Sequence, residues 1–446
     1  MRFMKRTLIV QFFLLLLLIV LLGQSLQAST GVKDHNAIIL QGFNWESYNK
    51  RHYVEITNKA QDIKDAGFNA VWFPPASYAY DGEGLYPHSR GYIPLGYMNF
   101  NSSYGSESEL IQAVSKLKSF GISPIADLVL NHRGVSYYEP GHQGDNNYAR
   151  FTDFDWGLWA FTSGTGQNGH GAKDSGDDFS YAFDIDITNQ TVRSDLSKLV
   201  KQLKHQIGFE GWRYDYVKGY RGEFVTYLND QTNPNISIGE YWTTMSYCGD
   251  NNLCPNQDSH RQEIINWMDS TWKGLPGKTA KDASLAFDFT TKGVLQESVR
   301  KGEYWRLKDS QGKPTGVLGW WPEKSVTFID NHDTGSTQGH WPFGNRDQVL
   351  LGYVYILTHP GVPTVFWDHY FHWNLKSEIK ELIRIRKQSK ITSNSKVEIL
   401  QAKQDLYVAR INDQLLVKIG KGHWSAGPEF ATPIQGHNYT IWLKSR

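Results

Sequence analysis

Cysteine is almost absent from this sequence: the 446 residues include only two, Cys248 and Cys254. A zinc site of the usual kind is excluded, because neither cysteine has a second Cys or His pair nearby at ligand spacing. The two thiols lie six positions apart, with Gly and Asn between them. In an exported protein such a pair can close a small loop disulfide, and two free thiols are the alternative.

A surplus of charge of either sign is also missing. There are 46 Lys and Arg residues against 45 Asp and Glu residues, so the formal net charge is +1. Loss of residues 1–28 would remove the three positive charges of Arg2, Lys5 and Arg6 and change +1 to −2. Neither value suits a nucleic-acid partner, so none is expected.

Long apolar runs are missing beyond the N-terminus. The one such run, Leu8–Leu22, follows a basic start and precedes a small residue, Ala28. It is shorter than the roughly 18–20 residues that cross a bilayer. Residues 1–28 are therefore predicted to be a signal peptide, which implies a secreted protein, extracellular or periplasmic, without stable membrane association after cleavage. An uncleaved anchor is the alternative.

Internal repeats and low-complexity linkers are absent as well, and the chain is too long for one simple core. Apolar strand-like runs alternate with amphipathic helical stretches, for example at 54–66, 107–120, 191–206 and 375–388. The apolar strand-like runs number eight, at 37–46, 68–75, 122–130, 209–217, 236–242, 284–291, 325–331 and 362–367. This alternation predicts an α/β fold, a (β/α)8 TIM barrel, in preference to an open sheet.

Two stretches interrupt the alternation. Residues 133–187, after the third strand, are rich in Gly, Asp, Asn and Tyr and are too long for a simple turn, so we expect a loop-rich inserted domain. From residue 391 to 446 short alternating strands follow one another without a long helix, which predicts a C-terminal antiparallel β-sheet domain. The barrel would then comprise residues 29–132 and 188–390.

Carboxylates stand at the ends of three separate strand-like runs: Asp215, Glu240 and Asp333. In a parallel barrel the strand ends of one face form the active site, and cleavage of a glycosidic bond requires such a set of carboxylates. For a single Asp, a helix cap or a salt bridge is the commoner explanation. That explanation fails for a set drawn from independent segments. The abundance of Trp and Tyr, 16 and 24 residues, suits a sugar groove but mostly reflects core packing.

Neighbouring residues suggest how these carboxylates are tuned. Arg213 and Asp215 are two apart on a strand, so they share a side, and Arg213 can keep Asp215 ionised. Tyr241 and Trp242 follow Glu240 and could raise its pKa, which would keep it protonated as an acid. Histidines stand near two strand ends, with His132 shortly after Asp127 and His332 directly before Asp333.

These segments resemble the four signature regions of the α-amylase family, glycoside hydrolase family 13. The resemblance is carried by DLVLNH (127–132), GWRYDYVKG (211–219), GEYW (239–242) and FIDNHD (328–333). Their order and spacing agree, and the similarity extends from residue 41 to the C-terminal sheet. It is closest to the plant and archaeal type, through Lys218-Gly219 and the segment 318–338.

The resemblance implies a retaining double displacement on α-1,4-glucans such as starch and glycogen. Asp215 would be the nucleophile, Glu240 the general acid and base, and Asp333 the residue that distorts the substrate and stabilises the oxocarbenium-like state. The residues that match substrate-binding positions are Tyr92, His132, Arg213, Lys218, Trp242 and His332. For Tyr92 the alternative is a loop aromatic that merely covers the barrel mouth.

The same resemblance implies a calcium ion, which prefers several carboxylate and carbonyl oxygens. Its expected ligands are the side chains of Asn131, Asp174 and Asp184 and the backbone oxygens of Asp177 and Gly219. An acidic solvated loop is the alternative. Trp320 and Trp321 match a tryptophan pair that forms a starch-granule site in plant relatives, although one ring could equally belong to the core. A monomer is expected.

Three functions remain open at this point. The first is an endo-acting α-amylase. The second is an enzyme of the same fold with another outcome, such as an exo-amylase that releases maltooligosaccharides or a transglycosylase. The third is a non-catalytic glucan-binding protein, which is disfavoured because no catalytic position is substituted.

Overall fold

The structure is a computed structural model that describes residues 36–79, 89–134, 153–154, 156–164, 169–250, 252–335, 337–431 and 433–445. The predicted signal peptide, residues 1–28, lies outside these ranges. Among the residues that are described, no helix is long and apolar enough to cross a membrane.

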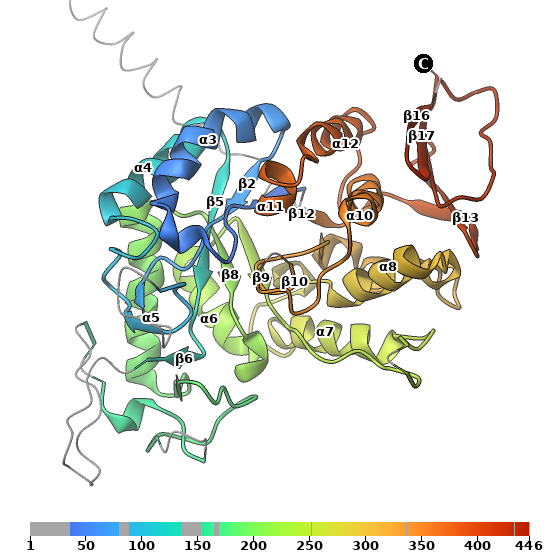
Figure 1. The fold of residues 1–446 in the computed structure, drawn as a ribbon. Coiled ribbons are helices and arrows are strands. Elements are labelled where there is room, and N and C mark those ends of the chain that lie inside the picture. Colours follow the sequence, from blue (N-terminus) through green and yellow to red (C-terminus); the bar gives the residue numbers. More distant parts are fainter. Residues whose placement is uncertain are drawn as a thin grey trace, which may run out of the picture.

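Eight parallel strands close into a barrel at the centre of the molecule (Figure 1). In their order around the barrel they are β1 (Ile39–Gln41), β12 (Val362–Phe366), β11 (Ser325–Phe328), β10 (Leu285–Phe287), β9 (Ile236–Gly239), β8 (Gly211–Tyr214), β5 (Ser123–Leu128) and β2 (Ala70–Trp72). The predicted (β/α)8 barrel is therefore confirmed, with all eight of its strands.

Helices surround this barrel. The longer ones are α3 (His52–Ala66), α4 (Glu107–Ser119), α5 (Gln190–Gln202), α6 (Gly222–Thr232), α7 (Asp258–Ser270), α8 (Phe289–Lys301), α10 (Arg346–Thr358) and α12 (Lys376–Gln388). Two short helices are α9 (Val317–Trp320) and α11 (Trp367–Phe371), and a π-helical turn, Leu203–Ile207, extends α5. Helix α4 starts where predicted, because Ser106 and Glu109 form a capping box that satisfies its first backbone N–H groups.

The strands are shorter than the apolar runs that predicted them. The run 37–46, for example, contains only the strand Ile39–Gln41, and the run 236–242 contains Ile236–Gly239. The regular strands end early, and only single backbone bonds, such as Gly42 N to Trp72 O, continue the pairing beyond them. The polar residues at the ends of the runs therefore belong to connecting loops.

Alternation along β8 separates the barrel interior from the helix layer. Trp212 and Tyr214 point outward, where Trp212 donates to Thr232 Oγ1 and the Tyr214 hydroxyl donates to Asn229, both on α6. Arg213 and Asp215 point inward and contact each other at 2.8 Å. The expectation that these two residues share one side of a strand is therefore confirmed.

The described parts of segment 133–187 hold little regular structure. They include a 3-10 turn, Leu158–Ala160, and the strand β7 (Phe183–Asp184), which pairs with β6 (His132–Arg133). This pairing returns the inserted segment to the end of β5. A second small antiparallel pair, β3 (Tyr78–Ala79) with β4 (Pro94–Gly96), lies in the loop after β2.

The C-terminal region is an antiparallel sheet that stands apart from the barrel mouth, beside α10 and α12 (Figure 1). Its strand order is β13 (Val397–Lys403), β14 (Leu406–Ile411), β15 (Leu415–Ile419), β17 (Tyr439–Leu443) and β16 (Ile434–Gly436). His359, which follows α10, bonds the hydroxyl of Tyr407 on β14 at 2.8 Å. The expected antiparallel sheet is therefore present, and it is joined to the barrel by a buried polar contact.

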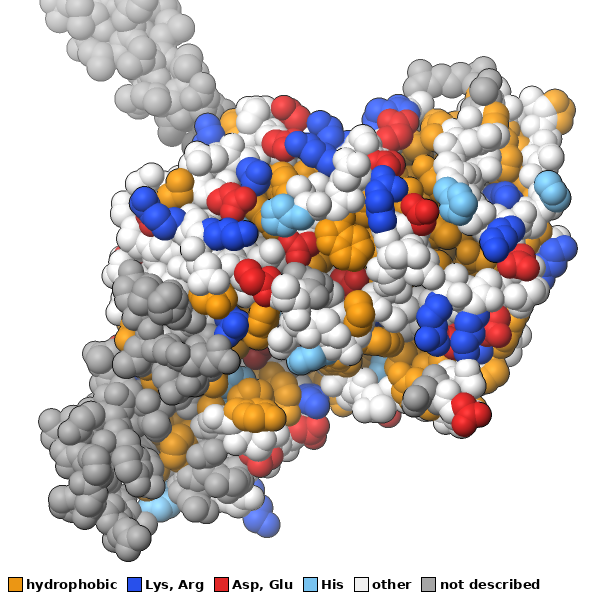
Figure 2. Space-filling model, viewed as in Figure 1, with side chains coloured by type: hydrophobic (Ala, Val, Ile, Leu, Met, Phe, Trp, Pro, Cys, Tyr) orange, Lys and Arg blue, Asp and Glu red, His pale blue; other side chains and the backbone are white. Residues whose placement is uncertain are grey.

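Charges of both signs are interspersed over the face of the molecule shown in Figure 2. Lys and Arg side chains lie beside Asp and Glu side chains there, as the near-zero net charge implies.

Candidate active site

The carboxylates predicted from the sequence meet at one end of the barrel. Asp127 is the penultimate residue of β5, Asp215 directly follows β8, and Glu240 directly follows β9. Backbone bonds extend the sheet past its formal ends, since Asp215 N donates to Leu128 O and Glu240 N donates to Tyr214 O, each at 3.0 Å. The positions of these two side chains are therefore set by the barrel itself.

A single buried guanidinium, that of Arg213, holds three of these carboxylates. Its Nη1 lies 2.7 Å from Asp127 Oδ1 and 2.8 Å from Asp215 Oδ1, and its Nη2 lies 2.6 Å from Glu240 Oε1. The ring of Trp72 covers the guanidinium, whose Cζ is 4.9 Å from the ring centroid. The expected pairing of Arg213 with Asp215 is present, but the arginine serves two further carboxylates that sequence spacing did not reveal.

Burial shifts the pKa values of these carboxylates upward. It raises the pKa of Asp215 to about 6, although Arg213 lowers it, and it raises the pKa of Asp127 to about 6 in the same way. Burial raises the pKa of Glu240 to about 7; Arg213 opposes this shift, and the charge of Asp215 adds to it. Near neutral pH Asp215 is therefore mostly ionised while Glu240 retains much of its proton.

Tyr241 and Trp242, which were expected to raise the pKa of Glu240, pack against other aromatic rings. Tyr241 stacks on Trp267 with ring centroids 6.3 Å apart, and Trp242 stacks on Phe289 at 5.1 Å. The general burial of the Glu240 carboxyl raises its pKa, together with the neighbouring Asp215 charge. The pKa of Glu240 is shifted upward, as predicted from the sequence, and the main cause is burial of the carboxyl itself.

Asp333 and His332 lie in the loop after β11 and contact each other, with His332 Nε2 3.3 Å from Asp333 Oδ2. Burial and the charge of Arg213 lower the pKa of His332 well below its usual value, so its ring is neutral. Gln41 Nε2 donates to His332 Nδ1 at 3.0 Å, which leaves the proton on Nε2, toward Asp333. Burial and the charge of Glu240 raise the pKa of Asp333 well above its usual value.

Aromatic rings form one wall of the site. Tyr92 stacks on His332 with centroids 5.0 Å apart and an interplanar angle of 5°, and Trp45 lies parallel to both rings. The Tyr92 hydroxyl donates to Asp127 Oδ2 at 2.9 Å. Tyr92 is thus fixed in the site by a hydrogen bond as well as by stacking, and does not merely cover the barrel mouth.

His132 is held from two sides. Its Nε2 donates to Tyr92 O at 2.8 Å, and its ring stacks on Phe179 with centroids only 3.7 Å apart. Burial lowers its pKa to about 4, so the ring is neutral near neutral pH. The inserted segment, which carries Phe179, therefore reaches the catalytic end of the barrel.

A cleft of about 610 Å³ opens beside Glu240. The predicted residues Lys218 and Trp242 line it, together with Tyr216, Tyr247 and Trp341, among others. Lys218 Nζ lies 3.8 Å from Oδ2 of Asp177, which also lines the cleft, and 5.0 Å from the centroid of the Tyr216 ring. The remaining predicted substrate contacts therefore lie on the Glu240 side of the site.

The residues predicted to bind calcium gather where the inserted segment meets the barrel. Asn131 Nδ2 donates to Asp184 Oδ1 at 2.8 Å, and a Cβ on Gly219 would lie 2.0 Å from Asn131 Oδ1. One oxygen of Asp174, Oδ2, is buried without a hydrogen-bond partner. The side chain of Asp177 points away, toward Lys218, while its backbone N–H donates to Lys218 O at 3.0 Å. Within the described ranges, no group of three or more His, Cys, Asp or Glu side chains is arranged as a metal site.

The tryptophan pair lies elsewhere on the barrel. Trp320 ends the short helix α9, and its ring lies beneath the guanidinium of Arg261, whose Cζ is 3.5 Å from the centroid. Trp321 is half-buried and packs against the core. Both rings are partly exposed, so the role in starch contact stays a prediction.

Several residues of the site were missed by reading the sequence. Gln41 is the last residue of β1 and Trp45 lies in the loop after it, Phe179 and Asp178 belong to the inserted segment, and Trp341 belongs to the loop after β11. Only Gln41 and Trp45 had a signal, since the resemblance begins at residue 41. The others reach the site through contacts between distant loops, which spacing along the chain does not encode.

Known proteins are similar to this chain in sequence and in architecture. A family description "Alpha amylase, catalytic domain" matches residues 53–369, and "Alpha-amylase C-terminal beta-sheet domain" matches residues 388–443. The chain belongs to the alpha-amylase family. It is 41% identical to "Probable alpha-amylase 2" of Arabidopsis thaliana, over 93% of this chain and 95% of that protein. It is also 38% identical to "Alpha-amylase 3, chloroplastic" of the same plant, over 94% of this chain and 45% of that protein.

Solved structures share the fold at low identity. α-Amylase I of Eisenia fetida superimposes with a TM-score of 0.61 at 15% identity, over 86% of this chain and 84% of that one. The cyclomaltodextrin glucanotransferase CldA gives 0.60 at 19% identity, over 82% and 78%. The family assignment, including its plant-type relatives, confirms the resemblance found in the sequence and makes this α-amylase a glycoside hydrolase.

The pKa values at the mouth predict a bell-shaped pH dependence of kcat/KM. With Asp215 as the predicted nucleophile and Glu240 as the predicted acid, activity should fall below about pH 6, where Asp215 takes up a proton, and above about pH 7, where Glu240 loses its proton. We expect a maximum between these two values, measured with starch from pH 4 to 9. Thermal melting at each pH separates loss of fold from titration, and a flat profile from pH 5 to 9 would contradict this assignment.

Proposed function

We propose that this chain is an endo-acting α-amylase that hydrolyses internal α-1,4-glucosidic bonds of starch, glycogen and related glucans with retention of configuration. The observation that carries the proposal is the contact of one guanidinium, that of Arg213, with both Asp215 and Glu240. Two carboxylates on one guanidinium lie close together, as a retaining enzyme requires; an inverting enzyme needs a wider gap for water. The relatives named as α-amylases support the activity.

In the first step Asp215 attacks the anomeric carbon while Glu240 protonates the leaving glycosidic oxygen. The product of this step is a β-glycosyl ester on Asp215. Glu240, now ionised, then takes a proton from a water molecule that attacks the ester, which restores both carboxyl groups. The pKa of Glu240, raised to about 7, suits a group that must both give and take a proton near neutral pH.

Asp333 and His332 act on the sugar ring that is cleaved. His332 is buried and holds the Asp333 carboxyl through Nε2, while that carboxyl stays partly exposed at the mouth, where it can bind sugar hydroxyls and favour the flattened ring. The stacked ring of Tyr92 supplies an apolar face against that same sugar. His132 and Arg213 also bind this sugar, while Lys218 and Trp242 bind the leaving-group side of the substrate.

A calcium ion fits the oxygen cluster between the barrel and the inserted segment. Asn131, Asp174, Asp184 and the backbone oxygens of Asp177 and Gly219 would hold it. Burial raises the pKa of Asp184 to about 8, and the neighbouring carboxylates Asp178 and Asp174 add to this shift. One Asp174 oxygen is buried without a hydrogen-bond partner. The ion would neutralise these carboxylates and join the inserted segment to the loops after β5 and β8.

The remaining parts of the proposal concern the setting of the enzyme. Residues 1–28 direct export, and the enzyme acts as a secreted monomer. Trp320, which lies beside Arg261, and Trp321 are both partly exposed and provide a further contact with starch. The interspersed charges on the face in Figure 2 suit a neutral polysaccharide.

Replacement of Asp215 by Asn tests the catalytic assignment. Wild-type protein lacking residues 1–28 should lower the viscosity of soluble starch early, well before many reducing ends appear, because internal bonds are cut. Asp215→Asn should release reducing ends at least ~1000-fold more slowly, because the covalent route is lost. Comparable activity in both proteins would refute the assignment, and reducing ends that rise without an early fall in viscosity would indicate an exo-acting enzyme.

Removal of calcium tests the proposed ion. Chelation with EDTA should lower the melting temperature, because the clustered carboxylates then repel one another and the ion no longer stabilises the folded state. Added Ca²⁺ should restore the original value. An Asp184→Asn variant should melt at a lower temperature and respond less to EDTA. An unchanged melting curve of the wild type after exhaustive chelation would count against the site.

A further inference from the structure

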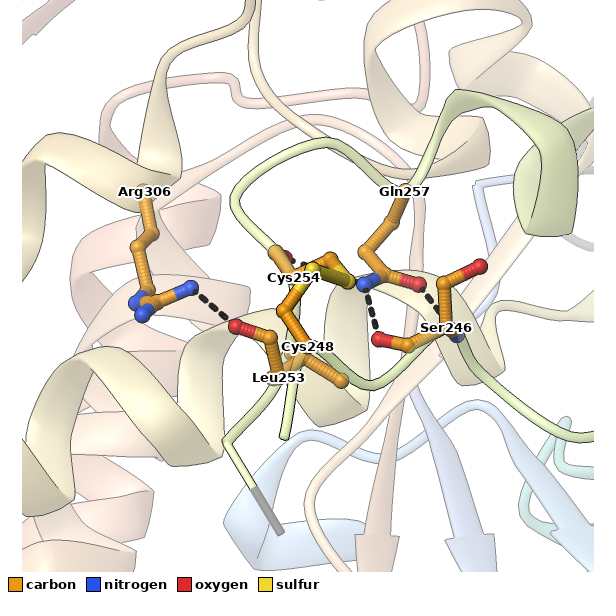
Figure 3. The surroundings of a disulfide bond; sticks show 6 residues. All are labelled: Ser246, Cys248, Leu253, Cys254, Gln257 and Arg306. Carbon is orange, nitrogen blue, oxygen red and sulfur yellow. Dashed lines mark hydrogen bonds between the residues drawn. A yellow bond between two sulfur atoms is a disulfide. The ribbon is translucent and has the colours of Figure 1, made fainter. Parts of the chain in front are cut away.

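The two cysteines close a short hairpin in the loop after β9 (Figure 3). Cys248 and Cys254 are joined by a disulfide, so the loop pairing expected from the sequence is confirmed. Tyr247 and Leu253 form an antiparallel bridge, Cys248 N donates to Asn252 O at 2.8 Å, and Cys254 N donates to Ser246 O at 2.9 Å. The disulfide therefore crosses the two arms one residue beyond Tyr247.

Buried polar side chains attach the base of this hairpin to the barrel (Figure 3). Gln257, which is buried, accepts from Ser246 N and donates to the backbone oxygens of Ser246 and Cys254 at 2.8 and 3.0 Å. Arg306 Nη1 donates to Leu253 O at 2.9 Å. The arms beyond these anchors are exposed: Cys248 is exposed and Cys254 half-buried. In the described part of the outer hairpin, the disulfide is accompanied by the bonds of Cys248 N to Asn252 O and of Asn252 N to Gly249 O, and by Lys301 Nζ of α8, which donates to Asn252 Oδ1.

Tyr247, directly before Cys248, forms part of the wall of the catalytic cleft. Half of its surface is exposed, and it lines the 610 Å³ cleft beside Glu240 together with Trp341. The same two rings also line a neighbouring hollow of about 250 Å³. Tyr247 and Trp341 therefore stand between the cleft and this hollow.

The ring of Trp341 packs tightly against helix α8. Gly293 on α8 allows close approach, since a Cβ there would lie 2.2 Å from the sulfur of Met245 and 2.7 Å from Trp341 Cη2. Lys292 Nζ, also on α8, donates to Trp341 O and lies 4.1 Å from the Trp341 ring centroid. Trp341 is thus fixed by the barrel, whereas the position of Tyr247 follows from the hairpin.

We propose that the Cys248–Cys254 disulfide is a positioning device for substrate binding: it holds Tyr247 opposite Trp341, where both rings contact glucose units on the leaving-group side of the cleaved bond. This inference rests on the proposed function and specifies which part of the substrate the hairpin recognises. Without the bond the exposed arms gain conformational freedom. Tyr247 must then be ordered when the substrate binds, and this loss of entropy reduces the binding free energy. Long glucans lose affinity, while substrates with a short leaving group are unaffected.

Chemical reduction tests this on the unaltered enzyme, because the chain has no other cysteine. Tris(2-carboxyethyl)phosphine converts the disulfide into two thiols; the phosphine takes the oxygen of one water molecule, and the two sulfur atoms take its hydrogens. Thiol titration verifies two thiols per chain. We expect KM for maltoheptaose to rise about fivefold, the scale of one lost aromatic contact. The kcat/KM for 4-nitrophenyl maltotrioside, whose leaving group is one aryl ring, should stay within twofold.

Variants separate the bond from the ring. Cys248→Ser/Cys254→Ser should match the reduced enzyme and ignore the phosphine. Tyr247→Ala should raise KM for maltoheptaose about fivefold in either redox state, while Tyr247→Phe, which keeps the ring, should behave as wild type. Tyr227→Ala is the matched control, since this partly exposed tyrosine on α6 lies beside Arg193 and lines neither hollow.

The outcomes are distinct. A rise in KM confined to maltoheptaose supports the proposal. Unchanged kinetics after complete reduction, a parallel loss on both substrates, or an unaffected Tyr247→Ala variant would overturn it. If the oxidised enzyme hydrolyses neither substrate, the proposed function itself fails, and this result is distinguishable from all the others.

Discussion

The contact on which the site depends is the buried guanidinium of Arg213 with three carboxylates. Charges that leave water need partners, and at this mouth Asp127, Asp215 and Glu240 all find theirs on one side chain. One cation cannot fully neutralise three anions, so burial still raises the pKa of each carboxyl. Near neutral pH this shift leaves Asp215 mostly ionised while Glu240 retains much of its proton, in the same small volume.

The barrel makes this arrangement possible because parallel strands end together. Asp127, Asp215 and Glu240 lie on three neighbouring strands, and each backbone is hydrogen-bonded to the next. Loops from other strands then complete the mouth: Tyr92 follows β2, and His332 and Asp333 follow β11. The rigid part of the fold therefore positions the carboxylates proposed to react, and the loops carry residues proposed to bind the substrate.

Much of this could be predicted from local sequence, and the remainder could not for a physical reason. Strand alternation placed Arg213 and Asp215 on one side, because side chains alternate with a period of two residues, and the ends of the apolar runs identified the carboxylates. The sharing of Arg213 with Glu240, and the stacking of Phe179 on His132, depend on how distant segments meet. Strand lengths were overestimated, because an apolar run continues past the last paired residue into the mouth.

The turn after β8 connects catalysis to the proposed calcium site. Tyr216 adopts the left-handed conformation, with φ of 46°, which is unfavourable for a residue with a side chain. In this conformation its N–H donates to Glu240 Oε2 at 3.2 Å, and its hydroxyl donates to Asp178 O at 3.1 Å. Three residues later, Gly219 packs against the Asn131 amide. A cation that orders the Asn131 cluster would therefore also steady the backbone that orients Glu240, the proposed general acid, so its effect on activity would act through Tyr216 and not through contact with the sugar.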